Sequence, residues 1–376
     1  MKHIMNILIT GGAGFIGQNL VYSLRKQGFG IRILDNFSPQ IHVTQSLPAD
    51  LVDQVELIRA DVRDRDALEQ ALAGVDGVVH LATETGTAQS MYQIAHYNNV
   101  NSQATAQLLD VLANAPHSIK KIVLASSRSI YGEGAYNCET HGLVYPGARS
   151  AAQLKSHQWD PVCPQCGASI VAVPTPEAAR PSPASIYAAT KYAQEDLIRI
   201  AGDSLGIGTA ILRFQNVYGA GQSLNNPYTG ILSIFSTRIR RGMSLPIFED
   251  GQESRDFVHV SDVVQAIELA LQTDAANGGT FNVGAGEPTS VLEIANMLVD
   301  AFDGKVRPEV TGQYRLGDIR HCYADLTQIR SKLRFEPKMS LKSGMEEFAS
   351  WVLSQPLPED GLDKANEELK KRKMMS

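Results

Sequence analysis

The sequence lacks any long apolar segment and any excess of basic residues. The first ten residues, Met1 to Thr10, carry neither a stretch long enough to cross a membrane nor a small-residue cleavage site. We therefore expect no membrane contact and a cytoplasmic location. Lysine and arginine number 34 against 40 acidic residues, which gives a formal net charge of -6. A nucleic-acid surface normally needs a basic patch, so we expect no nucleic-acid partner.

Cysteine is also scarce, with four in 376 residues. In a reducing cytoplasm these would remain thiols, so disulfides are a poor explanation for them. Hydrophobic residues make up 43% and charged residues 20%, which is ordinary for a soluble globular protein. At about 150 residues per domain, the length predicts two lobes.

A glycine-rich turn follows the first apolar run. Ile4 to Thr10 predicts a strand, and an amphipathic run through Gln27 predicts a helix. Between them, glycines permit a tight turn and close approach of a pyrophosphate, and the helix N-terminus favours its negative charge. This context indicates a dinucleotide site, because a glycine pattern alone is weak evidence. The residues expected to hold the phosphates are Gly11, Gly14, Phe15, Ile16 and Gly17.

An aspartate ends the second predicted strand, Gly30 to Leu34. Asp35 lies about 20 residues beyond the glycines, where a carboxylate accepts hydrogen bonds from the ribose hydroxyls and repels a 2′-phosphate. NAD is therefore favoured over NADP. A role as a loop-capping aspartate is the alternative.

Further strands are predicted at Val55 to Arg59, Gly77 to Leu81 and Lys121 to Ala125, with helical patterns between them. This alternation predicts an α/β fold with a doubly wound parallel sheet, whose ligand lies at the carboxyl ends of the strands. Three groups of residues are expected near the dinucleotide. They are Asn36 with Asp61 and Val62, then Leu81, Ala82 and Thr83, and finally Asn99.

A tyrosine and a lysine lie four residues apart in Ser185 to Lys191. On a helix this spacing places Tyr187 and Lys191 on one face, so the ammonium could favour the phenolate of a general base. A free tyrosine has a pKa near 10, and one lysine would not supply the whole shift of about 3 units. A positively charged nicotinamide would help. The alternative is an ordinary surface helix turn.

The ordered set of motifs resembles the extended short-chain dehydrogenase/reductase family of nucleotide-sugar enzymes, over about residues 5 to 350. Beside the glycine loop, Asp35 and the tyrosine-lysine pair, the resemblance rests on Asp61-Val62, His80-Leu81-Ala82, Asn99-Val100-Asn101, Ser126 to Gly132, Arg213 to Gly219, Arg255 to Asp262 and Phe281 to Gly284. It implies a Rossmann-like domain with bound NAD, a smaller C-terminal α/β lobe that binds a nucleotide-diphosphate sugar, and a homodimer.

The resemblance also implies roles for individual residues. Ser127, Tyr187 and Lys191 would form the catalytic triad, in which Ser127 steadies the substrate oxygen and Lys191 also binds the nicotinamide ribose. The substrate-binding residues it implies are Ser127, Arg128, Asn216, Arg255 and Arg320. Surface positions in solvent are the alternative for Arg255 and Arg320.

The residues after Ser127 favour one reaction over the others in the family. The 4,6-dehydratases that the chain resembles carry an Asp-Glu pair there, whereas this chain has Arg128 and Ser129. Without those proton carriers, elimination of water is disfavoured, and a 4-epimerase, an isomerase that oxidises C4 of the sugar transiently, is the leading hypothesis. The alternatives are a 4-keto nucleotide-sugar reductase and a non-catalytic dinucleotide-binding or zinc-stabilised module.

The segment between Tyr131 and Tyr187 contains an insertion that carries three cysteines. Two pairs of residues that are close in sequence, Cys138 with His141 and Cys163 with Cys166, supply three thiolates and an imidazole. These form a plausible tetrahedral zinc set in a reducing compartment. An unliganded loop with buried cysteines is the alternative, His157 is a substitute for the histidine, and Cys322 is expected to be a core cysteine. The four expected ligands are Cys138, His141, Cys163 and Cys166.

This insertion, together with Thr85 to Tyr92, resembles the bacterial members of the family that act on dTDP-L-rhamnose. A UDP-hexose of the glucose or N-acetylglucosamine type is the alternative substrate. We expect a dinucleotide-binding domain at 1–215 with the insertion at 136–180, a substrate lobe at 216–358 from which 256–275 returns to the first domain, and a charged tail at 359–376 that is helical or frayed.

Overall fold

Seven parallel strands form the central sheet of the computed structural model, which describes residues 5–42, 44–226 and 230–375. Ile4, the first residue of the expected opening strand, lies outside them. The strand order β13-β9-β5-β4-β1-β2-β3 reverses direction beside β1, as in a doubly wound sheet, and confirms the predicted fold class. The strands are β1 (Asn6–Thr10), β2 (Gly30–Asp35), β3 (Glu56–Arg59), β4 (Gly77–His80), β5 (Lys121–Ser127), β9 (Gly208–Phe214) and β13 (Gly279–Val283).

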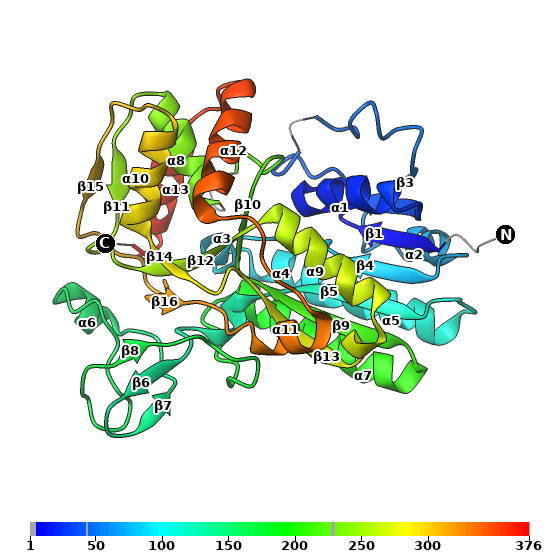
Figure 1. Cartoon of the computed structure of the whole chain (residues 1–376), viewed down its shortest axis with the longest axis horizontal. Helices are drawn as coiled ribbons and strands as arrows, with labels where there is room; N and C mark the ends of the chain where they lie inside the picture. Colours follow the sequence, from blue (N-terminus) through cyan, green and yellow to red (C-terminus); the bar gives the residue numbers. More distant parts are fainter. Residues whose placement is uncertain (1–4, 43, 227–229, 376) are drawn as a thin grey trace.

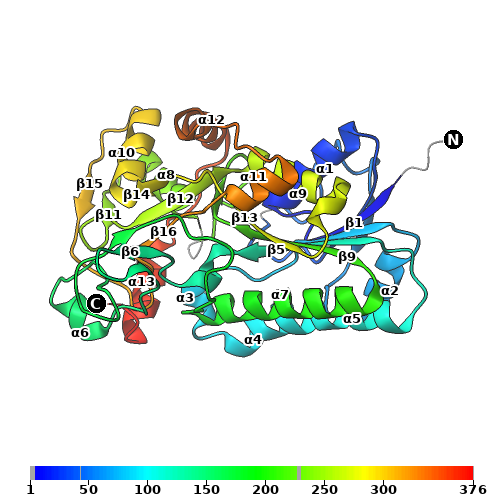
Figure 2. The same cartoon turned by 60° about the horizontal axis from the view of Figure 1, so that its bottom comes forward.

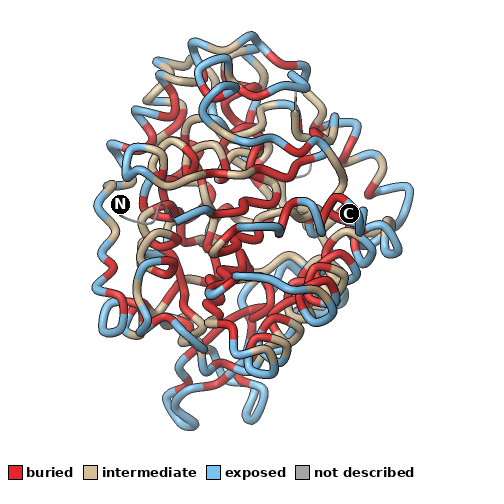
Figure 3. Tube along the Cα trace, turned by 90° about the vertical axis from the view of Figure 1, so that its right-hand side faces the viewer, coloured by how far each residue is buried: buried red, intermediate tan, exposed pale blue. Residues whose placement is uncertain are grey.

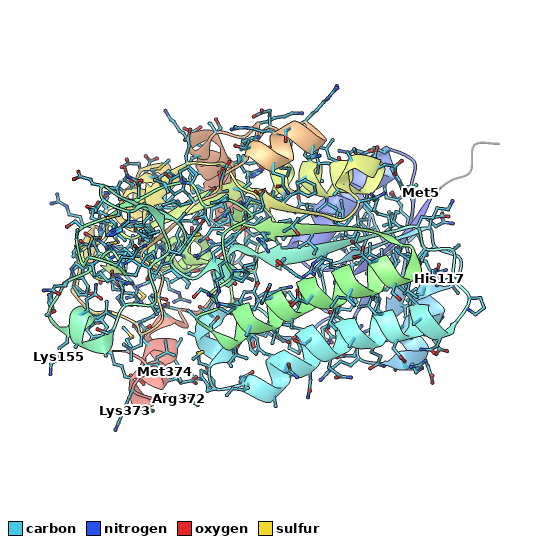
Figure 4. The ribbon with its side chains drawn as sticks, turned by 90° about the horizontal axis from the view of Figure 1, so that it is seen from below. Met5, His117, Lys155, Arg372, Lys373 and Met374 are labelled. Carbon is cyan, nitrogen blue, oxygen red and sulfur yellow. The ribbon has the colours of Figure 1, made fainter. Side chains whose placement is uncertain are left out.

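Helices cover both faces of this sheet (Figure 2). Successive strand residues point to opposite faces, so Ile7 and Ile9 join one core while Leu8 joins the other. The first core includes side chains of α1 (Phe15–Lys26), α9 (Val260–Gln272) and α11 (Thr327–Leu333), and the second those of α2 (Arg65–Leu72), α5 (Ala104–Asn114) and α7 (Ile186–Leu205). Seen from below, α7 and α5 lie side by side, with His117 beyond the end of α5 (Figure 4).

The start of α7 is well defined by its cap. The Ser185 hydroxyl accepts a hydrogen bond from the Ala188 amide at 3.1 Å, and the helix ends at Gly206 in the left-handed conformation. Tyr187 therefore lies in the first helical turn, at the carboxyl edge of the sheet, and Lys191 follows one turn later.

The smaller lobe has its own sheet and core. β12 (Ser254–His259) pairs with β10 (Asn216–Tyr218), β14 (Pro288–Ser290) and β16 (His321–Cys322), while β11 (Leu245–Ile247) pairs with β15 (Pro308–Val310). The core of this lobe includes side chains of α8 (Ile231–Arg240), α10 (Val291–Ala301) and α12 (Leu341–Ser354). The part of the chain that returns to the large domain is longer than the expected 256–275. It also includes β13, which pairs with β9, and α11, which packs on β13.

The insertion forms a small projecting unit below the body (Figure 1). Its antiparallel sheet has the order β7-β6-β8, and one short helix, α6 (Ala151–Lys155), lies between β7 and β8 in the chain. The strands are β6 (Tyr136–Cys138), β7 (Gly142–Val144) and β8 (Val171–Ala172). In Figure 3 this unit is again at the bottom, and most of the residues in its loops are exposed.

The tail is a helix, α13 (Leu362–Lys371), with Arg372 and Lys373 at its outer end (Figure 4). Leu362, Ala365 and Leu369 are buried. The charged residues that predicted a helix or frayed end thus lie on the outer face of a packed element. In the described part of the chain, no helix is both long and apolar enough to span a membrane.

Candidate active site

A cavity of about 1240 Å³ opens at the carboxyl ends of the strands, between the large sheet and the smaller lobe. This is the edge at which open α/β sheets bind their ligands. Its walls bring together most of the predicted site. The predicted residues that line it are Gly11, Gly14, Phe15, Ile16, Gly17, Asp35, Asn36, Asp61, Val62, Leu81, Ala82, Thr83, Ser127, Arg128, Tyr187, Lys191, Asn216 and Arg255.

The glycine loop is shaped for close backbone approach. Gly11 has φ +69°, and a Cβ built on it would lie 2.8 Å from the Ala82 amide nitrogen. A Cβ on Gly17 would lie 2.6 Å from the Gly12 Cα. Larger residues would therefore force β4 or the loop apart. The loop ends at the N-terminus of α1, whose partial positive charge suits a pyrophosphate.

Asp35 is held in place by the loops around it. One carboxylate oxygen accepts from the Ala13 amide at 3.0 Å, and the other accepts from the Phe37 amide at 2.8 Å. The capping alternative and the ligand-binding prediction are thus compatible, because a carboxylate has about four acceptor sites. The side chain lines the cavity, and its remaining capacity suits ribose hydroxyls.

Asp61 is a fixed anion at the next strand end. Arg63 donates from Nε at 2.7 Å, and this hydrogen bond is the main reason that the pKa of Asp61 falls to about 2. Asn36 donates to the second oxygen at 2.9 Å. The Asp61 carboxylate is therefore ionised near neutral pH and offers hydrogen-bond acceptors at this end of the cavity.

Asn99 is not part of the site. It is exposed on the outer side of the helical turn after α4 (Ile94–Asn98), and Val100 lines the cavity instead. Residues two apart on a helical turn point to nearly opposite sides, so Asn101 faces inward. Its oxygen accepts from Thr83 at 2.9 Å, and its amide donates to Thr190 at 2.9 Å, which ties the end of β4 to α7.

The catalytic candidates converge from β5 and α7. Ser127 lies at the end of β5, and its hydroxyl accepts from the Ser129 amide at 3.2 Å. Lys191 is only 2% exposed, and its ammonium donates to the Ala125 carbonyl at 2.9 Å. Burial lowers the pKa of Lys191 to about 7.

Burial also raises the pKa of Tyr187, against the opposing effects of a hydrogen bond with Ser127 and the charge of Arg128. The cation that lowers this pKa is thus Arg128 rather than Lys191, whose ammonium is directed to β5. The phenol is a proton donor in this environment, and it needs further positive charge to act as a base near neutral pH.

Two arginines, Arg128 and Arg255, line the cavity close to each other. Arg128 Nε donates to Asn216 Oδ1 at 3.2 Å, and its buried Nη1 has no partner among the described residues. Burial and the nearby charge of Arg255 lower the pKa of Arg128. A diphosphate would relieve this repulsion, because guanidinium groups bind phosphate oxygens through paired hydrogen bonds.

Arg320 does not bind at this site, contrary to the prediction. It is 2% exposed, and it pairs with Asp160 at 2.7 Å and Asp250 at 2.7 Å, with Glu249 at 3.1 Å. Arg315, which precedes the same Gly317-Asp318 turn, lines the cavity instead. The two arginines are five residues apart in one loop. The sequence alone did not indicate which of them faces the cavity.

Arg315 has the environment of a ligand-binding residue. Its Nη2 donates to Asn366 of the tail at 2.8 Å, and its guanidinium lies 4.6 Å from the centre of the Phe248 ring. Its Nε is buried without a hydrogen-bond partner in the described structure. The tail residues Leu362, Ala365 and Leu369 complete this wall, which the sequence did not predict.

The predicted metal ligands also come together, outside this cavity. One ligand atom from each of Cys138, His141, Cys163 and Cys166 lies within 4.8 Å of the others. His157 instead packs against Trp159, with ring centres 4.9 Å apart. Cys322 is buried, as expected of a core cysteine.

The profile of the NAD dependent epimerase/dehydratase family matches residues 7–150 and 163–284. The chain belongs to this family. The family match is interrupted between these ranges, within the cysteine-bearing insertion. Only residues 151–162 of the insertion lie outside the match, and they include α6.

Individual relatives agree with this assignment. The dTDP-L-rhamnose 4-epimerase of Burkholderia thailandensis is 38% identical over 352 residues, which cover 93% of this chain and 95% of the relative. The UDP-glucose 4-epimerase of Thermotoga maritima, solved with UDP-glucose, has a TM-score of 0.74 at 29% identity and covers 93% of this chain and 99% of its own. The UDP-glucose 4-epimerase of Thermus thermophilus, solved with NAD, has a TM-score of 0.74 at 25% identity and covers 94% and 100%.

Proposed function

We propose that the protein is an NAD-dependent nucleotide-sugar 4-epimerase whose substrate is dTDP-L-rhamnose. The observation that carries this proposal is the continuous cavity, which runs from the glycine loop past Ser127 and Tyr187 to the arginines of the smaller lobe. Such a cavity accommodates a dinucleotide and a nucleotide sugar end to end, with the phenol where they meet.

The residues fit NAD. The glycine loop packs too closely on its own backbone to accept a Cβ at Gly11 or Gly17, and it leads into the N-terminus of α1, which suits a pyrophosphate. The Asp35 carboxylate retains acceptor capacity toward the ribose. Its negative charge would repel the 2′-phosphate of NADP. When bound, NAD supplies the group that takes up the hydride from C4 and returns it.

The protein residues manage the accompanying proton. Tyr187 Oη takes the proton of the sugar 4-hydroxyl and gives it back after the 4-keto sugar has turned over. The Ser127 hydroxyl steadies the sugar oxygen, and it already shares a hydrogen bond with Tyr187. Lys191, one turn along α7, lines the same cavity and would hold the nicotinamide ribose.

The residues after Ser127 favour epimerisation over dehydration. Arg128, which is half-buried, and Ser129, which is buried, occupy the positions where the resembling dehydratases carry an Asp-Glu pair. A guanidinium cannot lose its proton at physiological pH, so it cannot replace the acid that elimination requires. A non-catalytic module is disfavoured because Ser127, Tyr187 and Lys191 all line the cavity.

The choice of dTDP-L-rhamnose is supported by the relative that is 38% identical over nearly the whole chain. The segment Thr85 to Tyr92 contributes directly to the site. Thr85, Thr87 and Ala88 line the cavity, and the Ser90 hydroxyl accepts from the Tyr187 amide at 3.0 Å. UDP-hexoses are the second candidate, because the similar enzyme of Thermotoga maritima was solved with UDP-glucose.

A panel of nucleotide sugars tests the proposal. The purified protein is incubated with dTDP-L-rhamnose, UDP-glucose and UDP-N-acetylglucosamine without added cofactor, and the products are identified by NMR. We expect a C4 epimer of dTDP-L-rhamnose. Conversion of only the UDP-hexoses would transfer the proposal to the second candidate. In a separate reaction with added NADPH and a 4-keto nucleotide sugar, net reduction of the sugar without any epimerase activity would replace epimerisation by a reductase activity.

The resemblance also favours a homodimer. The paired helices α5 and α7 form an outer layer of the large domain (Figure 4), and Ile200 of α7 is 64% exposed. Analytical ultracentrifugation is expected to find twice the chain mass of 40.8 kDa.

A further inference from the structure

The insertion gathers four ligand atoms with nearly tetrahedral spacing. Cys138 Sγ lies 3.6 Å from His141 Nδ1 and 3.8 Å from Cys166 Sγ, and Cys163 Sγ lies 3.6 Å from the same histidine nitrogen. All four atoms lie within 4.8 Å of one another. We propose that Cys138, His141, Cys163 and Cys166 bind a structural zinc ion.

The distances match those that zinc imposes. Zinc binds thiolate sulfur at about 2.3 Å and imidazole nitrogen at about 2.0–2.1 Å. At the tetrahedral angle, these bond lengths place two sulfurs about 3.8 Å apart and a sulfur and a nitrogen about 3.6 Å apart. The Cys138–Cys166 separation of 3.8 Å is too long for a disulfide, in which the sulfurs lie about 2.05 Å apart.

Two backbone turns present the ligands to each other. Cys138 ends β6, and His141 follows in the tight turn before β7, where Gly142 has φ +65°. In the opposite turn, the Gly167 amide donates to the Cys163 carbonyl at 2.9 Å, and the Cys163 amide donates to the Ala168 carbonyl at 2.8 Å. This turn directs Cys163 and Cys166 toward the first pair.

The apolar core beneath the strands of the insertion is small. Its buried cluster consists of Tyr136, Val144 and two of the proposed ligands, Cys138 and Cys163. Units of this size usually need a metal or disulfides, because they bury too little apolar surface to offset the loss of chain entropy. A core explanation for the cysteines also leaves out Cys166, which is exposed.

The four proposed ligands are typical of a structural zinc site rather than a catalytic one. Three thiolates and one imidazole fill all four positions of tetrahedral zinc, so none remains for water or substrate. The four residues lie outside the set that lines the active-site cavity. The ion would therefore stabilise the insertion and take no part in the chemistry at C4.

The insertion is attached to the substrate lobe by a buried arginine. Arg149 pairs with Glu249 at 2.7 Å and Glu133 at 3.3 Å, and it also donates to the Asp318 carbonyl at 2.9 Å. Asp318 belongs to the cavity lining. Removal of zinc is therefore expected to lower the Tm of the whole protein rather than to release an independent unit.

Elemental analysis of the full chain, purified without added metal or chelator, tests the proposal. We expect one zinc ion per chain. Cys166→Ser and His141→Ala are expected to lose most of it, whereas His157→Ala, the matched control from the same insertion, retains it. Less than about one tenth of an ion in the wild-type protein, or full zinc in Cys166→Ser, would overturn the proposal.

Cobalt substitution covers the case in which a ligand variant fails to fold. Wild-type protein loaded with Co²⁺ should show the intense visible absorption of tetrahedral thiolate coordination, with a sulfur-to-metal charge-transfer band, and His157→Ala should show the same spectrum. A weak octahedral spectrum, or binding of another metal in preference to zinc, would contradict the assignment.

Discussion

Replacement of Arg315 by lysine tests whether this arginine, rather than Arg320, contacts the diphosphate of the substrate. In the structure, Arg315 lines the cavity with Nε unpaired among the described residues, and its Nη2 is held by Asn366. Lysine keeps the charge but loses the planar fork that pairs with a diphosphate. A hydrogen bond to a charged group contributes about 1.5–3 kcal/mol. The expected result is a KM for the nucleotide sugar about 10- to 100-fold higher.

Steady-state kinetics with the nucleotide sugar provide the measurement. We expect kcat to change little, because the diphosphate contact is equally strong in the ground state and the transition state. An unchanged KM, or a fall in kcat alone, would refute this role for Arg315.

The matched control is Arg320→Lys. Arg320 is buried among Asp160, Glu249 and Asp250, so loss of its fork is expected to lower the Tm and leave KM nearly unchanged. A large KM effect from this variant, with an unchanged Tm, would restore the original prediction that Arg320 contacts the diphosphate.

Three further predictions concern single residues. Tyr187→Phe should lower kcat by about 10²- to 10⁴-fold with the fold intact by circular dichroism, and near wild-type turnover would contradict the proton-transfer role. Asp35→Ser should increase the fraction of NADP among the dinucleotides released on denaturation, and unchanged NAD preference would show that the carboxylate does not select the cofactor. His80 is buried against Thr10 and Thr105, and burial lowers its pKa to about 3. In the unfolded chain His80 binds a proton near pH 6.5, whereas in the folded chain it stays neutral. The contribution of His80 to the free energy of unfolding should therefore fall by about 1.4 kcal/mol per pH unit between about pH 6 and 4. The Tm difference between wild type and His80→Gln should therefore narrow toward acid pH, and a constant difference would contradict this account.

The sequence predicted best the features that local chemistry determines. The glycine loop, Asp35 and the tyrosine-lysine pair depend on turn geometry and helical spacing, and they lie where expected. The four proposed zinc ligands also lie together as predicted, because each of the two pairs is close in sequence and occupies one turn.

The errors arose where tertiary packing decides which way a side chain points. Asn99 and Asn101 belong to one motif, and only the packing of their helical turn on α7 shows that Asn101 faces inward. Arg315 and Arg320 flank one turn, and the carboxylates that bind Arg320 come from segments 70 and 160 residues away. The return of β13 to the large sheet is also a pairing between distant segments.

The most direct test of the central claim follows the hydrogen at C4. dTDP-L-rhamnose carrying deuterium at C4 is incubated with the purified protein in ordinary water, and the epimer is examined by NMR and mass spectrometry. Transient oxidation with return of the same hydride predicts that the C4 epimer keeps its deuterium at C4, with no net NADH formed. Loss of the deuterium to solvent would contradict the mechanism, and the absence of any C4 epimer would contradict the proposed function.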